Sequence, residues 1–357
     1  MNRHVLRLMS VALVLLVFRS SRPGSTAAPV RLIDDAASPY RWCDAADAFD
    51  AASEAGKAAY AYRRALELGS HEGPVLLRAA NFQLTRANPA SALPYFARLL
   101  QLVPDYDASI FGTYSAMRFP VADILQQGVP ADRRAGVAYF DYLLSQGAPS
   151  ADLALGWRWL GRHGFRQERL AGLYTAALLR DGRYDEALKM WTDFAGPYAR
   201  GNRVYNGSFE KAPLASPLDW TIASELVQRD TANAQTGKFA LKIQFSGTEN
   251  IDFHDVWQSL VVEPGLYHLE AFVKTSGITT AEGLRLHLFD AQQPGRLDFW
   301  TESFTGNRPW TRLDCPIRVY RQTHLLTLQL CRRASPRADN KVAGTVWVDA
   351  ISLVRQP

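Results

Sequence analysis

The chain has 357 residues, which is long enough for two domains with separate hydrophobic cores. Hydrophobic residues make up 47% of it and charged residues 21%, so the composition is globular and excludes an intrinsically disordered chain. The net charge is only +5, and a local basic cluster at Arg332, Arg333 and Arg337 is interpreted as a solvated loop. Because a nucleic-acid-binding protein usually carries a denser basic stripe on one element, we expect no nucleic-acid partner.

Residues 1–27 are predicted to form a signal peptide. Basic residues precede the apolar run Leu8–Phe18, and small residues at 25–27 suit a signal peptidase. Arg19 and Arg22 are unusual after such a run, so an uncleaved membrane anchor is the alternative. The run is short for a bilayer span, and no later run is apolar enough to be one. We therefore expect a periplasmic or secreted bacterial protein.

The three cysteines fit an exported protein without requiring a disulfide. Cys315 and Cys331 are a plausible pair, because they lie symmetrically about residues 322–324, as partners in a hairpin would. Strand alternation, however, directs the two thiols to opposite faces unless a bulge intervenes. Both the bridged and the reduced state therefore stay open.

Residues 39–198 are helical in pattern and contain a 34-residue repeat, in which Trp42–Leu68 aligns with Leu76–Leu102. The matched pairs are Ala46 with Ala80, Ala58 with Ala92, Tyr62 with Phe96, and Leu68 with Leu102. A further fragment, Gly172–Ala195, repeats the pattern of a small residue followed by an aromatic one. This period and this pattern resemble the tetratricopeptide repeat, which implies an α-solenoid of stacked helical pairs.

Such solenoids present a concave groove, so the resemblance implies a protein partner bound there. Tyr139, Tyr142, Trp157 and Trp159 are candidates to line the groove, and the alternative is that most of them pack between helices. No set of residues in this half has the pattern of a catalytic site.

After a linker at 199–203, residues 204–355 change to a period of two. The alternating segments are 239–245, 266–274, 284–289, 310–319, 325–330 and 345–353, with turn residues between them. Many short strands without intervening helices predict a β-sandwich. We interpret Val204–Trp220 and Val346–Leu353 as its first and last strands.

Several motifs of this half occur in an order that is similar to that of a known family. They are NGSFE at 206–210, PLDW at 217–220, TGKFALKIQF at 236–245, VVEPGLYHLEAFVKT at 261–275, PWTRLD at 309–314 and VWVDAISL at 346–353. Together they resemble the jelly-roll carbohydrate-binding modules of secreted xylanases. The resemblance implies a multidomain α plus β protein whose jelly roll binds a glycan or polysaccharide and has no catalytic activity of its own.

The resemblance also implies a structural calcium ion. In the family, its ligands are a glutamate of the NGSFE-type segment and an aspartate of the last strand, which correspond here to Glu210 and Asp349. The carbonyl of Lys238 is a further candidate ligand. The alternative is that both acids bond backbone amides at the sheet edge without a metal.

Glycan binding needs aromatic rings that stack on sugars and polar side chains that bond the hydroxyl groups. The candidate aromatic residues are Trp257, Trp300, Trp310 and Tyr320, and of these we favour Trp257 and Trp300. The candidate polar residues are Arg285, His287 and Gln329, on strand faces opposite the leucines. By the resemblance, Trp220 and Trp310 occupy positions that pack the core.

No enzyme is expected, because a glycoside hydrolase needs two carboxylates across a cleft and Glu249, Asp252 and Asp255 share one short segment. The leading hypothesis is a non-catalytic exported scaffold, whose solenoid binds a protein and whose jelly roll binds a glycan. Proteins with these two halves resemble accessory components of bacterial polysaccharide synthesis or export. One alternative is a structural adaptor without a sugar site, and a less favoured one is a hydrolase that uses Glu249 or Asp255.

Overall fold

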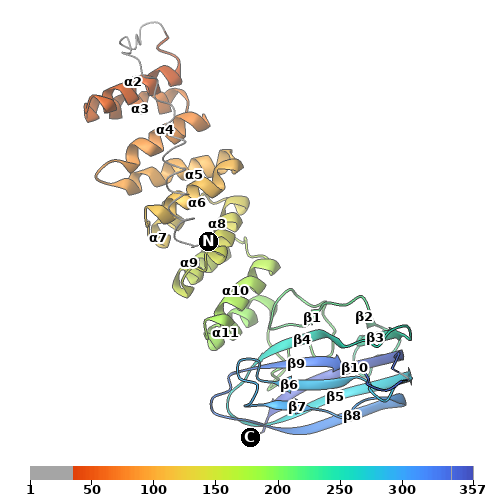
Figure 1. The fold of residues 1–357 in the computed structure, drawn as a ribbon. Coiled ribbons are helices and arrows are strands. Elements are labelled where there is room, and N and C mark those ends of the chain that lie inside the picture. The colour runs from red at the N-terminus through yellow and green to blue at the C-terminus, as the bar shows by residue number, and fades with distance from the viewer. Residues whose placement is uncertain (1–34, 339, 357) are drawn as a thin grey trace. The chain divides into compact units, whose positions relative to one another are not determined.

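The computed structural model describes residues 35–338 and 340–356, and the predicted signal peptide at 1–27 lies outside them. The chain divides into two compact units, one of which ends at Arg166 and the other of which begins at Gln167. Each unit is therefore described by itself (Figure 1). Within the described residues, no helix is both long and apolar enough to cross a membrane.

The secondary structure of the described part of the first unit is helical, as predicted. Its helices are α2 (Pro39–Ala51), α3 (Ala55–Leu68), α4 (Gly73–Leu84), α5 (Leu93–Leu102), α6 (Asp107–Ala116), α7 (Val121–Asp123), α8 (Arg133–Ser145) and α9 (Ser150–Arg162). Short 3₁₀ turns at Pro89–Ala92 and Pro104–Tyr106 and a π turn at Ile124–Gly128 connect some of them. Consecutive helices pack as the pairs α2 with α3, α4 with α5, and α8 with α9.

The small residues of the repeat allow these helices to approach closely. The four matched alanines, Ala46, Ala58, Ala80 and Ala92, are fully buried. The aromatic residue that follows the second alanine of each unit, Tyr62 or Phe96, is also buried. The last matched pair differs, because Leu68 and Leu102 are 42% and 38% exposed. The shared packing positions explain the period, and the assignment to the tetratricopeptide family stays a prediction.

The aromatic residues proposed for a concave groove lie mostly between helices. Tyr139, Trp157 and Trp159 are buried, and Tyr139 packs 5.2 Å from Phe111 between ring centres. Tyr142 is partly exposed, and its hydroxyl lies 2.8 Å from that of Ser115. Three of the four residues therefore belong to the core, as the alternative interpretation had it.

The second unit begins with two helices, α10 (Glu168–Arg180) and α11 (Tyr184–Ala195), and continues with ten strands. The strands are β1 (Thr221–Ile222), β2 (Val227–Asp230), β3 (Ala240–Ser246), β4 (Phe253–Val261), β5 (Gly265–Ile278), β6 (Arg285–Phe289), β7 (Asp298–Trp300), β8 (Gly306–Val319), β9 (Leu325–Arg332) and β10 (Ala343–Arg355).

The strands form two five-stranded antiparallel sheets. The β4/β9 sheet has the order β1-β4-β9-β6-β7, and the β3/β10 sheet has the order β2-β3-β10-β5-β8 (Figure 1). From β3 to β10 the chain changes sheet after every strand except β6, and β10 pairs between β3 and β5. This connectivity is that of a jelly roll. Alternate apolar side chains of both sheets form one core between them.

The predicted alternating segments coincide with β3, β5, β6, β8, β9 and β10, but β4 was not predicted. Its register shifts between Phe253 and Val256, so the period of two is interrupted near its start. The prediction that Val204–Trp220 is the first strand is wrong, because this segment consists of turns and irregular backbone.

Left-handed backbone at two residues prevents this segment from extending. Asn206 and Phe209 have φ of 51° and 55°, and an extended strand requires negative φ. The segment still lies against β10, because the Ile351 amide donates to the Gly207 carbonyl at 2.9 Å. A β-carbon on Gly207 would overlap the carbonyl oxygen of Ile351, which explains the glycine at this close approach.

Helices α10 and α11, which the sequence assigned to the helical half, pack against the sandwich. Trp191 of α11 is fully buried, and its ring lies edge-on to that of Tyr205 at 5.8 Å. The Tyr205 hydroxyl donates to the Ala195 carbonyl at 2.6 Å, and the Ala215 amide donates to Glu168 at 3.1 Å. The two helices thus share one compact unit with the strands.

The three cysteines, Cys43, Cys315 and Cys331, have free thiols. Cys315 lies on β8 and Cys331 on β9, which belong to different sheets. The reduced state is therefore the one that the structure contains. Burial raises the pKa of Cys43 to about 11 and that of Cys331 to about 12.

Candidate functional site

Four of the five residues proposed for glycan binding form one row across the outer face of the β4/β9 sheet. Trp257 on β4 pairs with Gln329 on β9, Gln329 pairs with His287 on β6, and His287 pairs with Trp300 on β7. The leucines that alternate with His287 and Gln329 are buried in the core, as is Val256 next to Trp257, so the row faces outward. It covers three inter-strand spacings, about 14 Å, which is the length of a short oligosaccharide.

The β6–β7 end of the row is a stack of aromatic rings. The imidazole of His287 lies 3.6 Å from the Trp300 ring and 4.3 Å from the Phe289 ring between centres, nearly parallel to both. Asp298 fixes the stack, because its Oδ1 accepts from Nε2 of His287 at 2.6 Å and from Nε1 of Trp300 at 2.9 Å. Burial lowers the pKa of His287 below its ordinary value, although Asp298 opposes this shift.

Both faces of the Trp300 ring are covered. The guanidinium carbon of Arg333 lies 3.9 Å from the ring centre, and an atom beside the ring edge could not come so close without overlapping ring atoms. Arg333 therefore covers one face, and His287 at 3.6 Å covers the other. Trp300 offers its edge to a ligand in this arrangement, whereas sugar stacking needs a face.

The β4–β9 end of the row is more open. Trp257 is partly exposed, and among the described residues neither an aromatic ring nor a cation stacks on it. Gln329 beside it is fixed, because its Nε2 donates to the backbone carbonyl of His254 at 2.9 Å. Nε2 of His254 lies 3.0 Å from Asp252. Trp257 is thus the ring of the row that can stack on a sugar, with polar groups beside it.

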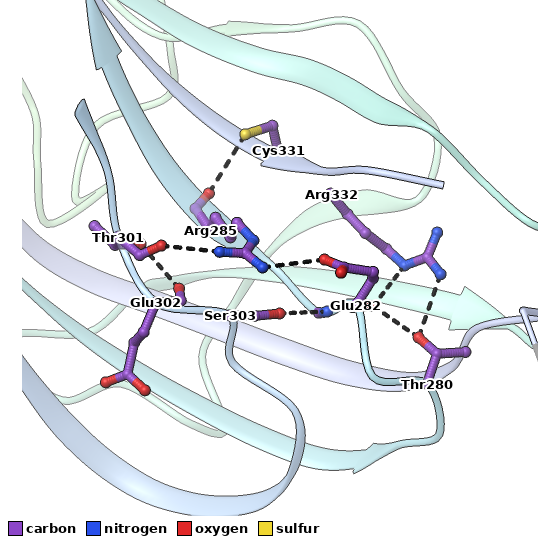
Figure 2. A network of polar contacts seen from close by, with 9 residues as sticks. Thr280, Glu282, Arg285, Thr301, Glu302, Ser303, Cys331 and Arg332 are labelled. Atoms are coloured by element: carbon purple, nitrogen blue, oxygen red, sulfur yellow. Dashed lines mark hydrogen bonds and ion pairs between the residues drawn. The ribbon is translucent and has the colours of Figure 1, made fainter. Parts of the chain in front are cut away.

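The fifth residue, Arg285, is engaged in a network next to the row (Figure 2). Its guanidinium donates to the Thr301 carbonyl at 3.2 Å and to the Glu282 carboxylate at 3.1 Å. Nearby, the fully buried Arg332 donates to the Glu282 carbonyl at 2.9 Å and to the Thr280 hydroxyl at 3.2 Å. Arg285 therefore supports the β6 edge of the face, and both of its terminal guanidinium nitrogens are already occupied by protein groups.

Arg332 joins further segments to this network. It also donates to the carbonyls of Ile251 and, at 3.3 Å, Asn340. One side chain thus connects the segments before β4, before β6 and before β10. Desolvation lowers the pKa of Arg332 from its usual value, which reflects the burial of a charged group among neutral acceptors.

Sequence reasoning missed Asp298, which orients both rings of the stack. It lies two residues before Trp300 on β7, a three-residue strand that the alternation pattern did not identify. An acid next to two aromatic residues in the segment DFW was the available signal.

Trp220 and Trp310 differ from each other in the structure. Trp220 is buried in the core, as expected, and its Nε1 donates to the Asn206 carbonyl at 3.1 Å. Trp310 is partly exposed and is not part of the core cluster, so the expectation for it was wrong. It lies on β8 where the pairing with β5 is irregular.

Of the clustered acids of the hydrolase alternative, Asp255 lies on β4, whereas Glu249 and Asp252 precede this strand. Asp252 lies against His254, as described above. The backbone carbonyl of Asp255 accepts from Ala223, and that of Glu249 accepts from Val342 at 3.3 Å. Hydrolysis by these acids stays a prediction of the less favoured alternative.

Glu210 and Asp349 hold one turn between β2 and β3. Asp349 accepts the amides of Gln235 and Thr236, both at 2.8 Å. Glu210 accepts the amide of Lys238 at 2.8 Å and that of Phe239 at 3.0 Å. Lys238 thus contributes its N–H group, whereas a calcium ligand would be its carbonyl oxygen.

The pKa values of the two carboxylates are shifted in opposite directions. Burial raises the pKa of Asp349, with a smaller contribution from the nearby charge of Glu210. The amides of Phe239 and Lys238 lower the pKa of the exposed Glu210. Calcium needs six to eight oxygen ligands, whereas here N–H donors converge on both acids, so this donor set does not fit the ion. Calcium binding stays a prediction of the resemblance alone.

No family model matches the chain, and no curated protein has significant similarity to it. Several solved structures are similar to it in part. A family 61 carbohydrate-binding module in complex with β-1,4-galactotriose is 14% identical, with 43% of this chain and 99% of that one covered and a TM-score of 0.32. A family 16 module is 16% identical, with 43% and 100% covered and a TM-score of 0.33.

A xylan-binding family 22 module from Paenibacillus barcinonensis is 18% identical to this chain, with 42% and 94% covered and a TM-score of 0.30. These similarities concern the C-terminal half of the chain. At such identities and TM-scores the assignment of the fold rests on the strand topology, and the candidate site rests on its own geometry.

Proposed function

We propose that the protein is a non-catalytic scaffold whose jelly roll binds a glycan on the outer face of the β4/β9 sheet. The row from Trp257 to Trp300 carries this proposal, because four side chains of the types that bind sugars lie in register across four strands. Trp257 provides the stacking ring. The polar atoms of Gln329, His254 and Asp298 lie beside the path of the ligand.

The helical half is proposed to bind a protein partner. This part of the proposal rests on the repeat pattern, because the aromatic residues first considered for a groove are mostly buried. An exported protein with both activities would bring a glycan to a protein of bacterial polysaccharide synthesis or export. The alternative is an adaptor whose sandwich makes only protein contacts.

The test is binding of the full chain to an array of plant and bacterial polysaccharides, followed by titration of each positive glycan. Trp257→Ala is expected to weaken binding by about tenfold or more, since one stacked ring contributes on the order of 1.4 kcal/mol. Trp310→Ala removes a partly exposed tryptophan from the other sheet and is the matched control. Retention of full affinity in Trp257→Ala, or a loss that is equal in both variants, would refute this site.

A further inference from the structure

Beside the turn that Glu210 and Asp349 hold lies a cation of the chain itself, Arg229 of β2. Its Nε donates to the Phe209 carbonyl at 2.8 Å, and one terminal nitrogen donates to the Glu210 carbonyl at 2.8 Å. The guanidinium carbon lies 3.8 Å from the centre of the Phe239 ring. Arg229 therefore joins the irregular segment after Gly207 to the start of β3.

The carboxylate of Asp349 has little remaining capacity for a metal. It is fully buried and accepts three amides, those of Gln235, Thr236 and its own neighbour Ala350, the last at 2.6 Å. A carboxylate that binds calcium needs lone pairs directed at the ion. Calcium would have to displace these donors from a carboxylate that has no exposed surface.

Arg229 also fits the charge of the site. Glu210 lies close enough to Asp349 for their like charges to repel, which raises the pKa of Asp349. The positive charge of Arg229 lowers the pKa of Glu210 and so favours its charged form. The amides of residues 235, 236, 238 and 239 add four N–H dipoles directed at the two acids. The two negative charges are thus compensated by groups of the chain.

We propose that Glu210, Asp349 and Arg229 form a metal-independent clasp. In this clasp the guanidinium and the turn amides compensate the two carboxylates and connect the segments, a role that the family resemblance assigns to calcium. The clasp connects the segment before β1, the turn between β2 and β3, and the last strand. Its stability depends on the arginine, and the fold of the second unit is the same with or without divalent cations. This inference is independent of whether the outer face of the β4/β9 sheet binds a glycan.

The experiment compares the thermal unfolding of the full chain after dialysis against EDTA with its unfolding in excess calcium chloride. The melting temperature is expected to be the same in both. A saturable rise with calcium that is absent in Glu210→Gln would overturn the proposal. This variant removes a charge at an exposed position, so it is expected to fold.

A second set of variants tests the role of the cation. Arg229→Gln is expected to lower the melting temperature equally in EDTA and in calcium, and Arg229→Lys is expected to recover only part of the loss, because lysine lacks the planar fork. Arg312→Gln, which removes a more exposed arginine paired with Glu270 on the same sheet, is the matched control and should change little. An unchanged melting temperature in Arg229→Gln would also overturn the proposal.

Discussion

Gly172 of α10 lies directly against the backbone carbonyl of Ala215, so closely that a β-carbon on the glycine would overlap the carbonyl oxygen. This contact joins a helix to the irregular segment that precedes β1. Because the obstacle is backbone, a larger residue cannot be accommodated by a side-chain rotation. The contact places α10 in the same packed unit as the strands.

Gly172→Ala is therefore expected to destabilise the second unit by about 1–3 kcal/mol or more, because the helix must move away from the sandwich. Gly112, in α6, is the matched control, since a β-carbon there meets nothing within 4 Å. Gly112→Ala should stabilise the protein by about 0.5–1 kcal/mol, because alanine favours the helix. Urea unfolding of both variants measures the difference, and equal effects would contradict the close approach.

The boundary of the C-terminal unit can be tested with two fragments. The fragment 167–357 keeps α10 and α11, and the fragment 203–357 lacks the helices that cover Tyr205. We expect the longer fragment to melt higher by roughly 5–10 °C, because about 2–3 kcal/mol of contact is lost in the shorter one. Calorimetry of both fragments gives the result. Identical melting temperatures would show that the helices add nothing to the sandwich.

Asp219 is expected to make stability depend on pH in the acidic range. Burial raises its pKa to about 6, although the amides of Leu214 and Trp220 favour the charged form. Between the ordinary value of an aspartate, about 4, and this value, the folded chain holds a proton that the unfolded chain has lost. Stability from this group is therefore fully present below about pH 4 and is lost as the pH rises through 6.

Asp219→Asn removes the titrating group and is expected to reduce this slope. The measurement is the free energy of unfolding in urea from about pH 4 to about pH 7 for the wild type and the variant. The difference between the two curves isolates Asp219 from the other carboxylates. Parallel curves across the whole range would contradict the raised pKa.

The thiols are expected to be free and mostly unreactive in the native protein. Cys43 and Cys331 are buried with raised pKa values, so little thiolate is available to attack a disulfide reagent. Burial also raises the pKa of the partly exposed Cys315. Titration with Ellman's reagent in urea, without a reductant, should give three thiols per chain, as many as the sequence has cysteines. One thiol per chain would instead indicate a bridge between Cys315 and Cys331.

Arg332→Lys is expected to destabilise the second unit by roughly 2–4 kcal/mol, because lysine cannot reach the four acceptors of this buried guanidinium and leaves carbonyls unpaired. Arg337→Lys, at an exposed position in the loop that follows β9, is the control and should be neutral. Denaturant unfolding distinguishes the two. A neutral Arg332→Lys would show that Arg332 is not needed to connect the three segments.

Alternation in the sequence was sufficient to predict six of the strands and the face to which Arg285, His287 and Gln329 belong, but it missed the nine-residue β4. His287 and Gln329 were assigned outward because they alternate with leucines, and the structure places them so. That they share one row with Trp257 and Trp300 depends on strand register, which the sequence does not specify. The stack that covers Trp300 was equally beyond prediction, since Arg333 comes from a distant segment.

The segment from Val204 to Trp220 shows the opposite case, in which a recognisable motif suggested the wrong element. Its apolar residues are buried as in a strand, but Asn206 and Phe209 adopt left-handed backbone. Positive φ at asparagine is common, whereas at phenylalanine it is sustained only by surrounding contacts such as the 2.8 Å bond from Arg229 to its carbonyl. Those contacts are tertiary, so local sequence patterns could not reveal them.

The row on the β4/β9 sheet runs across strands, and each strand contributes a single member to it. A deletion of one residue within β9 would replace Gln329 by a neighbouring leucine at the centre of the face and would bury the amide in the core. The proposed glycan-binding face is consequently tolerant of changes in loop length between strands but intolerant of insertions or deletions inside them. Its composition can therefore change by substitution in the strands and by length only in the turns.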